Sequence, residues 1–214
     1  GWGPCPDGIK DWWGDDFLRD VVKGKQLFAV GSSEPGAGSD AASEKTSAVR
    51  DGDEYIINGV KRYISFVPGA TIMGTSCQTA PKKGLFGVSW IKVELDRPGV
   101  KITSIPEMGL RGHQLGNIVL KDVRVPVSNL MAEEHRGLYA VFNRWGLMRI
   151  YNTMYPLGAA MQSIDETIEF VKRRVAFGRP IGKFEAVQFR IVEDYTNIEL
   201  TKLMAYRGLW LADR

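Results

Sequence analysis

The stretch Ser33-Glu34-Pro35-Gly36-Ala37-Gly38-Ser39-Asp40 decides the interpretation of this chain. It follows an apolar run at 27–30 and combines glycines with short polar side chains. Glycine lets a ligand approach the backbone closely, and serine hydroxyls donate or accept hydrogen bonds. The stretch therefore predicts a binding segment for an electron-rich, oxygen-bearing ligand such as a flavin or a pyrophosphate.

Part of this stretch also fits a dinucleotide-binding fingerprint. Residues 36–41 match the relaxed pattern G-x-G-x-x-A, which requires a helix next and then a parallel strand. The following strand-like sequence is instead Tyr55-Ile56-Ile57-Asn58-Gly59-Val60-Lys61-Arg62-Tyr63-Ile64. Asn58-Gly59 between two such runs predicts a β-hairpin and antiparallel pairing. The pattern therefore disfavours a Rossmann domain.

The remaining sequence divides into a β-rich part and a helical part. A short helix is predicted within the polar, Trp-rich lead-in, over about 12–22. A long helix is predicted over about 134–177, with Pro156 as a kink or break and Gly178 as the C-terminal cap. A second helix is predicted over 184–213, apolar on more than one face. Strands are predicted at 27–30, 54–65, 85–95, 100–104 and 117–125.

Composition excludes several classes of protein. The chain has 214 residues, 44% of them apolar, and a formal net charge of +3, with the basic residues scattered. We therefore expect a sizeable core and no nucleic-acid partner. Cys5 and Cys77 provide neither a disulfide framework nor a metal-ligand pattern, which favours the cytoplasm and no metal site. We also expect no secretory leader and no membrane span, because no apolar run approaches about 18 residues.

Four ordered segments resemble the acyl-CoA dehydrogenase family of flavoproteins. Residues 33–40 are similar to T-E-P-x-A-G-S-D, and residues 55–65 to Y-x-I-N-G-x-K-x-W-I-T. Met108-Gly109-Leu110-Arg111-Gly112 then leads to a strand ending at Pro126, and residues 174–181 are close to R-x-x-F-G-x-x-I. The resemblance covers almost the whole chain from about Lys25 onward.

The resemblance implies an α+β fold. An antiparallel, β-barrel-like middle domain would be followed by long helices that form part of a four-helix bundle. Residues 1–24 would end an N-terminal helical domain, residues 25–127 would form the flavin- and acyl-CoA-binding β domain, and residues 128–214 would form part of the C-terminal bundle. Two helices are half of a bundle, so we expect the chain to be part of a longer protein.

The resemblance also implies FAD as the cofactor and assigns its contacts. The backbone and hydroxyl groups near the isoalloxazine ring would come from Val30, Gly31, Ser32, Ser33, Gly38 and Ser39. Tyr63 takes the position of the family's ring-packing Trp, followed by Ile64 and by Ser65, whose hydroxyl would reach flavin N5. Arg174 and Phe177 match the family's residues at the flavin pyrophosphate. In the family, this pyrophosphate belongs to the cofactor of a neighbouring subunit. Glu185 stands where the family usually has Gln, and Ala176 where a hydroxyl is common.

On the substrate side, the resemblance places Ser39 and Arg149 near the acyl-CoA. The reaction needs a carboxylate base for the α-proton of the thioester. A minority of the family carries this Glu just before the matching arginine, where this chain has Met148. We therefore assign no catalytic residue and expect the base beyond Arg214.

The function implied is α,β-dehydrogenation of an acyl-CoA, with electrons passed to an acceptor such as an electron-transfer flavoprotein. We expect a homodimer or homotetramer, because the helix over 184–213 has more apolar surface than one neighbour covers. Two alternatives stay open: a flavin monooxygenase or oxidase on the same fold, and a catalytically silent subunit of a hetero-oligomeric acyl-CoA dehydrogenase.

Overall fold

The computed structural model describes residues 14–213, except for the side chains at 85, 140, 143 and 144. These residues fall into two compact units that divide between Phe142 and Asn143. The first unit begins with helix α2 (Asp15–Val22), which confirms the short helix near the start as far as it lies within the described residues. Residues 12 and 13, where the predicted helix began, and Cys5 lie outside the described residues.

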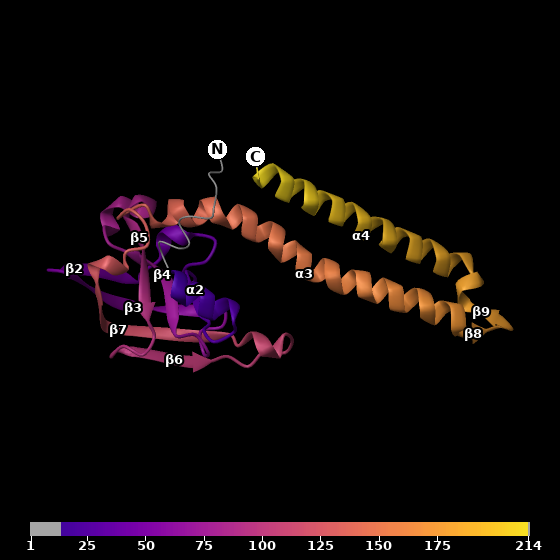
Figure 1. The fold of residues 1–214 in the computed structure, drawn as a ribbon, viewed down its shortest axis with the longest axis horizontal. Coiled ribbons are helices and arrows are strands. Elements are labelled where there is room, and N and C mark those ends of the chain that lie inside the picture. Colours follow the sequence, from indigo (N-terminus) through magenta and orange to yellow (C-terminus); the bar gives the residue numbers. More distant parts are fainter. Residues whose placement is uncertain (1–13, 214) are drawn as a thin grey trace. The chain divides into compact units, whose positions relative to one another are not determined.

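A curled, mixed sheet forms the first unit (Figure 1). The strand order is β1-β4-β2-β3-β7-β6, and β5 pairs with β4. Four pairings are antiparallel, whereas β1 and β2 each pair in parallel with β4. The sequence predicted five of the seven strands within three residues. The strands are β1 (Phe28–Gly31), β2 (Ser47–Asp51), β3 (Glu54–Ile64), β4 (Ile72–Gln78), β5 (Val88–Glu94), β6 (Val100–Ser104) and β7 (Gly116–Pro126).

The two strands that the sequence did not predict are β2 and β4. β4 reads Ile-Met-Gly-Thr-Ser-Cys-Gln, and six of its seven residues are buried. The glycine and the lack of alternation between apolar and polar residues weaken its strand signal, but neighbours within the fold satisfy its buried Thr75 and Ser76 side chains. Thr75 Oγ1, for example, donates to Gly31 O at 2.7 Å.

The predicted hairpin at Asn58-Gly59 is wrong. These residues lie inside the continuous strand β3, whose register against β7 shifts between Ile57 and Gly59. The turn lies earlier, where Asp51 pairs with Glu54 and Gly52 has φ 62°. The two turn residues are Gly52 and Asp53, and a glycine with positive φ at the first of them is typical of a type II′ hairpin turn. Gly59 instead permits a close approach to Thr46, because an added Cβ would collide with it.

The antiparallel pairing itself and the absence of a Rossmann unit at residues 36–41 are confirmed. Ala41–Ser43 forms a single 3₁₀ turn, and the next strands, β2 and β3, pair antiparallel.

The hydrophobic core of the first unit lies against this sheet. Its fully buried members share strand positions that face inward, among them Ile57, Met73, Ile91, Val93, Ile118, Val123 and Val125.

Two long helices supply most of the second unit. Helix α3 (Gly137–Arg173) begins at the end of the first unit and continues through Pro156, so the predicted break is absent. Helix α4 (Glu185–Ala212) has Phe184 as its N-cap and confirms the second predicted helix. Contacts of Ile150 with Gly208, and of Val171 with Gly182, pack this part of the chain together.

Gly178 is not the C-terminal cap of α3, as the sequence predicted. The helix ends at Arg173, and strands β8 (Val175–Ala176) and β9 (Arg179–Pro180) form a small hairpin. Phe177 and Gly178 form its turn with φ 52° and 76°. Two successive positive φ values are typical of a type I′ hairpin turn, which explains the glycine at the second position.

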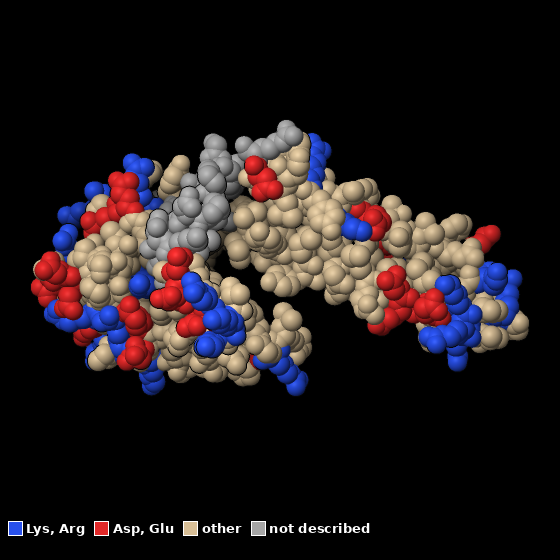
Figure 2. All heavy atoms as spheres, in the orientation of Figure 1, with Lys and Arg blue, Asp and Glu red and all other residues tan. Residues whose placement is uncertain are grey.

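Many large apolar side chains of α4 are exposed, as its sequence pattern predicted. Surface charges on the face drawn in Figure 2 are of both signs and intermingled. No helix between residues 14 and 213 has the length and apolar character needed to cross a membrane. The exposed apolar side chains of α4 are Phe189, Val192, Tyr195, Leu200, Leu203, Met204, Tyr206, Trp210 and Leu211.

Candidate flavin site

The glycine-rich stretch forms a tight turn directly after β1. Glu34 N donates to Ala37 O at 2.8 Å, and Ala37 N donates to Glu34 O at 3.3 Å. Pro35 and Gly36 therefore occupy the tip of a two-residue turn. Added Cβ atoms at Gly36 and Gly38 would meet nothing within 4 Å, so both positions are open toward a ligand. Gly31 differs, because an added Cβ would lie 2.7 Å from Met73 Sδ and would displace that buried side chain.

Glu34 anchors this turn from inside the protein. Its carboxylate accepts hydrogen bonds from Lys45 N at 2.7 Å, Thr46 N at 3.0 Å and Lys61 Nζ at 2.9 Å. Its side chain is only 5% exposed. Burial alone would raise the pKa of Glu34, but these hydrogen bonds and the Lys61 charge hold it below its ordinary value. Glu34 therefore anchors the turn, and the exposed residues beside it form the candidate ligand-facing surface.

A backbone hydrogen bond brings the second predicted flavin segment beside the first. Arg62 N donates to Ser33 O at 2.8 Å, so Ser32 and Ser33 lie beside the end of β3. Tyr63, at this end, has φ 59° and a side chain that is 56% exposed. The Arg62 guanidinium lies 4.8 Å from the Tyr63 ring centroid. The structure thus unites residues that stand thirty positions apart in sequence.

The predicted residues of the two segments differ in what they offer a ligand. Ser33 and Ser39 are exposed, Ser65 is partly exposed, and Val30 is 46% exposed. Within residues 14–213, nothing hydrogen-bonds to the hydroxyls of these three serines. Ile64 is a core residue, 2% exposed, so a ligand would reach its backbone only. Open glycines, unused hydroxyls and an accessible aromatic ring are the features that a flavin edge requires.

Lys61 is the site-forming residue that sequence reasoning missed. Its side chain is completely buried, and its Nζ bonds to Glu34 Oε1 and, at 3.1 Å, to Glu44 Oε2. The sequence held a signal, because Lys61 lies in a strand with several apolar residues and two glutamates lie in the loop between β1 and β2. That signal is weak without knowledge of the register that turns Lys61 inward.

The other predicted site residues lie in the second unit. Arg149 is an exposed residue of α3, and the neighbouring Met148 is 51% exposed. Arg174 follows the end of α3, where its N–H donates to Phe170 O at 2.9 Å. Glu185 is the exposed first residue of α4.

The β8–β9 hairpin presents an aromatic and cationic cluster. The Phe177 side chain is 95% exposed at the tip, and its ring centroid lies 6.2 Å from that of Phe184. The Arg179 guanidinium lies 4.2 Å from the Phe184 ring centroid. Arg179 is thus a second guanidinium on the hairpin that carries Arg174. Guanidinium groups bind phosphate oxygens, and sequence reasoning had singled out only Arg174.

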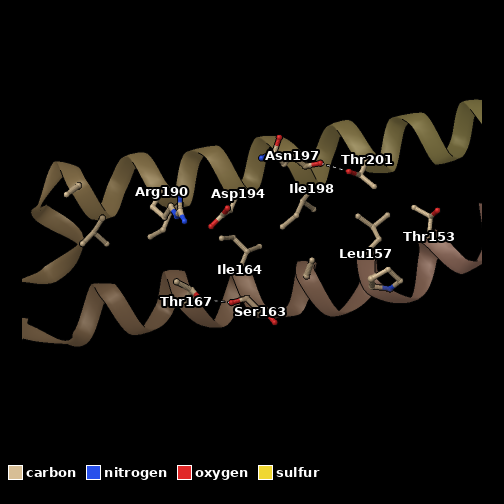
Figure 3. Close-up of a pocket in the computed structure, with 15 residues that line it drawn as sticks. Thr153, Leu157, Ser163, Ile164, Thr167, Arg190, Asp194, Asn197, Ile198 and Thr201 are labelled. Atoms are coloured by element: carbon tan, nitrogen blue, oxygen red, sulfur yellow. Dashed lines mark hydrogen bonds between the residues drawn. The ribbon is translucent and has the colours of Figure 1, made fainter. Parts of the chain in front are cut away.

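A groove of about 740 Å³ runs between α3 and α4 (Figure 3). Leu157, Ile164 and Ile198 point into it from the two helices. Its threonine hydroxyls bond within their own helices: Thr153 Oγ1 donates to Arg149 O at 3.1 Å, Thr167 Oγ1 to Ser163 O at 2.7 Å and Thr201 Oγ1 to Asn197 O at 2.7 Å. These properties are typical of a helix-packing surface.

Within residues 14–213, no group of three His, Cys, Asp or Glu side chains is placed to hold a metal ion.

Comparison with known proteins identifies the class of protein to which this chain and its fold belong. Residues 29–123 match the family model of the acyl-CoA dehydrogenase middle domain, and residues 135–214 match that of the acyl-CoA dehydrogenase C-terminal domain. The chain belongs to the acyl-CoA dehydrogenase family. FAD is the cofactor of this family.

Individual relatives agree with this assignment. A probable acyl-CoA dehydrogenase of Bacillus subtilis is 35% identical over 198 residues, which are 92% of this chain and 52% of that protein. A caffeyl-CoA reductase–Etf complex subunit of Acetobacterium woodii is 33% identical over 93% of this chain and 53% of its own length. The crystal structure of an acyl-CoA dehydrogenase from Geobacillus kaustophilus matches with a TM-score of 0.87 and 33% identity, over 94% of this chain and 55% of that one. The chain therefore spans about half the length of the relatives it matches.

Proposed function

We propose that this chain is part of an FAD-dependent acyl-CoA dehydrogenase that oxidises an acyl-CoA between its α and β carbons. The observation that carries the proposal is the side-by-side placement of the segments bearing Ser33 and Ser65, joined by the bond from Arg62 N to Ser33 O. Together they offer unused hydroxyls and an exposed aromatic ring, in a chain of this family.

The proposed contacts follow from these positions. Val30 to Ser33, with Gly38, would line the flavin with backbone groups and one hydroxyl. Tyr63 would pack on the ring system, the Ile64 backbone would border it, and the Ser65 hydroxyl would bind at N5. When bound, FAD supplies the acceptor for the hydride that leaves the β carbon.

The pyrophosphate contact is assigned to the β8–β9 hairpin. Arg174 binds phosphate oxygens as a bidentate donor, and Phe177 packs beside it, both on the cofactor of a neighbouring subunit. Glu185 would repel a diphosphate by itself. Its place at the N-terminus of α4 and the nearby guanidinium groups offset that repulsion.

The substrate contacts complete the proposal. Ser39, exposed after the glycine turn, would hydrogen-bond to the pantetheine arm of the acyl-CoA. Arg149 would lie toward the thioester end. Met148 cannot accept a proton, so the base that removes the α-proton is expected in the sequence that follows Arg214 in the full-length protein.

The proposed activity is tested with the purified full-length protein. We expect a yellow chromophore that bleaches when an acyl-CoA is added without oxygen, because the hydride that leaves the β carbon would reduce the flavin. A series of acyl-CoA esters, with free CoA as the control, identifies the preferred substrate. A colourless protein that cannot be reconstituted with FAD would contradict the proposal.

Re-oxidation of the reduced enzyme distinguishes the alternatives. An electron-transfer flavoprotein is the proposed acceptor, since one relative is named as a subunit of a complex with Etf. That relative is named as a reductase, and reduction of an enoyl-CoA is the reverse of the proposed reaction. Fast re-oxidation by oxygen would indicate an oxidase or monooxygenase instead. Turnover only with a co-purified homologous subunit would indicate a silent chain.

The proposed assembly is a homodimer or a dimer of dimers whose interface includes α4. The exposed apolar side chains on several faces of this helix support it, because such faces are stable only when covered. We expect the full-length holoprotein to sediment as a dimer or tetramer. A holo-monomer with tightly held FAD would contradict the assignment of Arg174 to a neighbouring subunit's cofactor. We place the enzyme in the cytoplasm, where a free thiol such as the buried Cys77 persists.

A further inference from the structure

A single buried ammonium group lies beneath the two flavin segments. Lys61 Nζ is within hydrogen-bond distance of four oxygens, although it has only three protons to donate. Two of them belong to carboxylates, one to a hydroxyl and one to the backbone of the flavin segment. They are Glu34 Oε1 at 2.9 Å, Glu44 Oε2 at 3.1 Å, Ser76 Oγ at 3.2 Å and Ser32 O at 3.3 Å.

The contact with Ser32 gives this cluster a role beyond charge pairing. Consecutive residues of β3 bind consecutive carbonyls of the flavin segment, since Lys61 Nζ reaches Ser32 O and Arg62 N reaches Ser33 O. The Lys61 side chain is buried, and β3 continues from it through the exposed Tyr63 to Ile64, directly before Ser65. The relative position of the Ser33 and Ser65 hydroxyls therefore depends on where Lys61 sits.

The charges of the cluster hold the ammonium group in place. Side-chain exposure is 0% for Lys61, 5% for Glu34 and 2% for Glu44, so water does not screen the three charges. Burial raises the pKa of Glu44 above its ordinary value despite the Lys61 charge, and the Glu44 Oε1 atom has no hydrogen-bond partner within the described residues. Burial also raises the pKa of the nearby Cys77 thiol to about 12, which keeps that group neutral. Both Glu34 and Glu44 lie beside the Lys61 ammonium, and of the two carboxyl groups only Glu34 has its pKa lowered.

Stability alone does not explain a lysine at this position. A buried ion pair is often no more stabilising than apolar residues of similar volume, because desolvation of the charges opposes their attraction. An apolar residue at 61, however, provides no donor for Ser32 O. The Lys61 ammonium therefore provides a contact with Ser32 O that an apolar residue of similar volume would lose.

We propose that Lys61 is a positioning residue that fixes the Ser32-Ser33 backbone against the end of β3 and thereby sets the affinity and redox potential of the bound flavin. This inference rests on the proposed function, because it requires FAD at this site. Lys61 acts through the two segments and is not assigned a contact with the flavin.

The test compares variants of the full-length protein. Lys61→Met alone would leave two buried carboxylates without a counter-charge, so the main variant is the neutral triple substitution Lys61→Met with Glu34→Gln and Glu44→Gln. The matched control is Lys101→Met, at an exposed lysine of β6. Three quantities are measured: the thermal unfolding midpoint of the apoprotein, the Kd for FAD, and the midpoint potential of the bound flavin.

We expect the triple variant to fold and to bind FAD at least tenfold more weakly, with a changed midpoint potential. A tenfold difference between its losses of affinity for oxidised and reduced flavin corresponds to about 30 mV for a two-electron couple. Lys101→Met should match the wild type in all three quantities. A triple variant with unchanged Kd and potential would overturn the proposal and leave Lys61 a structural residue.

A second variant decides the question if the triple variant does not fold. Lys61→Arg keeps the charge but replaces a compact ammonium with a larger planar group, so the Ser32 contact is altered while the ion pair remains. We expect a folded protein with a three- to tenfold weaker Kd for FAD and a shifted potential. Wild-type values for both would overturn the inference. A wild-type protein that binds no FAD would instead refute the proposed function.

Discussion

Gly59→Ala should destabilise the β-domain by about 3 kcal/mol, at the upper end of what overpacking a core costs. A Cβ at Gly59 would lie 2.6 Å from the Thr46 Cα and closer still to its hydroxyl, and real Cβ atoms do not approach a backbone so closely. Thr46 cannot move aside easily, because its N–H donates to Glu34 and its carbonyl accepts a bond from Gln78 N at 2.8 Å. The measurement is urea unfolding of the full-length apoprotein.

The control for this substitution is Gly109→Ala. Gly109 has open space around its Cβ position and a backbone conformation that alanine also adopts. We expect its free energy of unfolding to stay within about 0.5 kcal/mol of the wild type, as for most surface substitutions. If Gly59→Ala were equally harmless, the close approach of β3 to Thr46 would not exist in solution. FAD binding should weaken in Gly59→Ala as well, since Thr46 helps to hold Glu34.

Arg174→Ala should weaken FAD binding 10- to 100-fold, the effect expected from the loss of one or two hydrogen bonds to a charged group. Its effect on folding should be small. Arg174 is exposed, and its N–H bond to Phe170 O survives the substitution. The Kd for FAD and the thermal unfolding midpoint of the apoprotein, measured together, separate these two effects.

Arg173→Ala is the matched control for Arg174→Ala. Arg173 is the exposed last residue of α3, and its guanidinium donates to Glu169 O at 3.1 Å. We expect its substitution to leave the FAD affinity within about twofold, because its side chain is engaged on its own helix. Equal losses of affinity in both variants would indicate a general electrostatic attraction and would contradict a specific contact by Arg174. A loss confined to Arg179→Ala would move that contact to the other side of the hairpin.

Local patterns predicted most elements of the fold. The long helices followed from apolar residues at helical spacing, and five strands followed from β-branched and aromatic runs bounded by turn residues. β4 was missed because its small polar residues become buried only when neighbouring strands cover them, and β2 because it is short and ends in two charged residues, Arg50 and Asp51. The Asn58-Gly59 signal was misleading, because a bulge and a close approach require the same residues as a hairpin turn.

The candidate site shows the same division. The serines, glycines and aromatic residues of the candidate site were predicted from the composition of the glycine-rich stretch and from the resemblance to the family's motifs. Lys61 was not found, because its importance depends on which face of β3 is buried. The bulge between Ile57 and Gly59 shifts that register, and no local pattern of charged residues reveals it.

By itself, the sequence determined the class of fold, the order of its parts and the chemical character of its binding segments. Those properties arise from interactions between residues close together in the chain. Only the tertiary structure showed the hydrogen bond from Arg62 N to Ser33 O and the close approach of Gly59 to Thr46. It also showed that Glu34 and Glu44 both form ion pairs with Lys61. The physical reason is that burial and charge pairing depend on strand register and on contacts between distant segments, which are fixed only when the sheet is assembled.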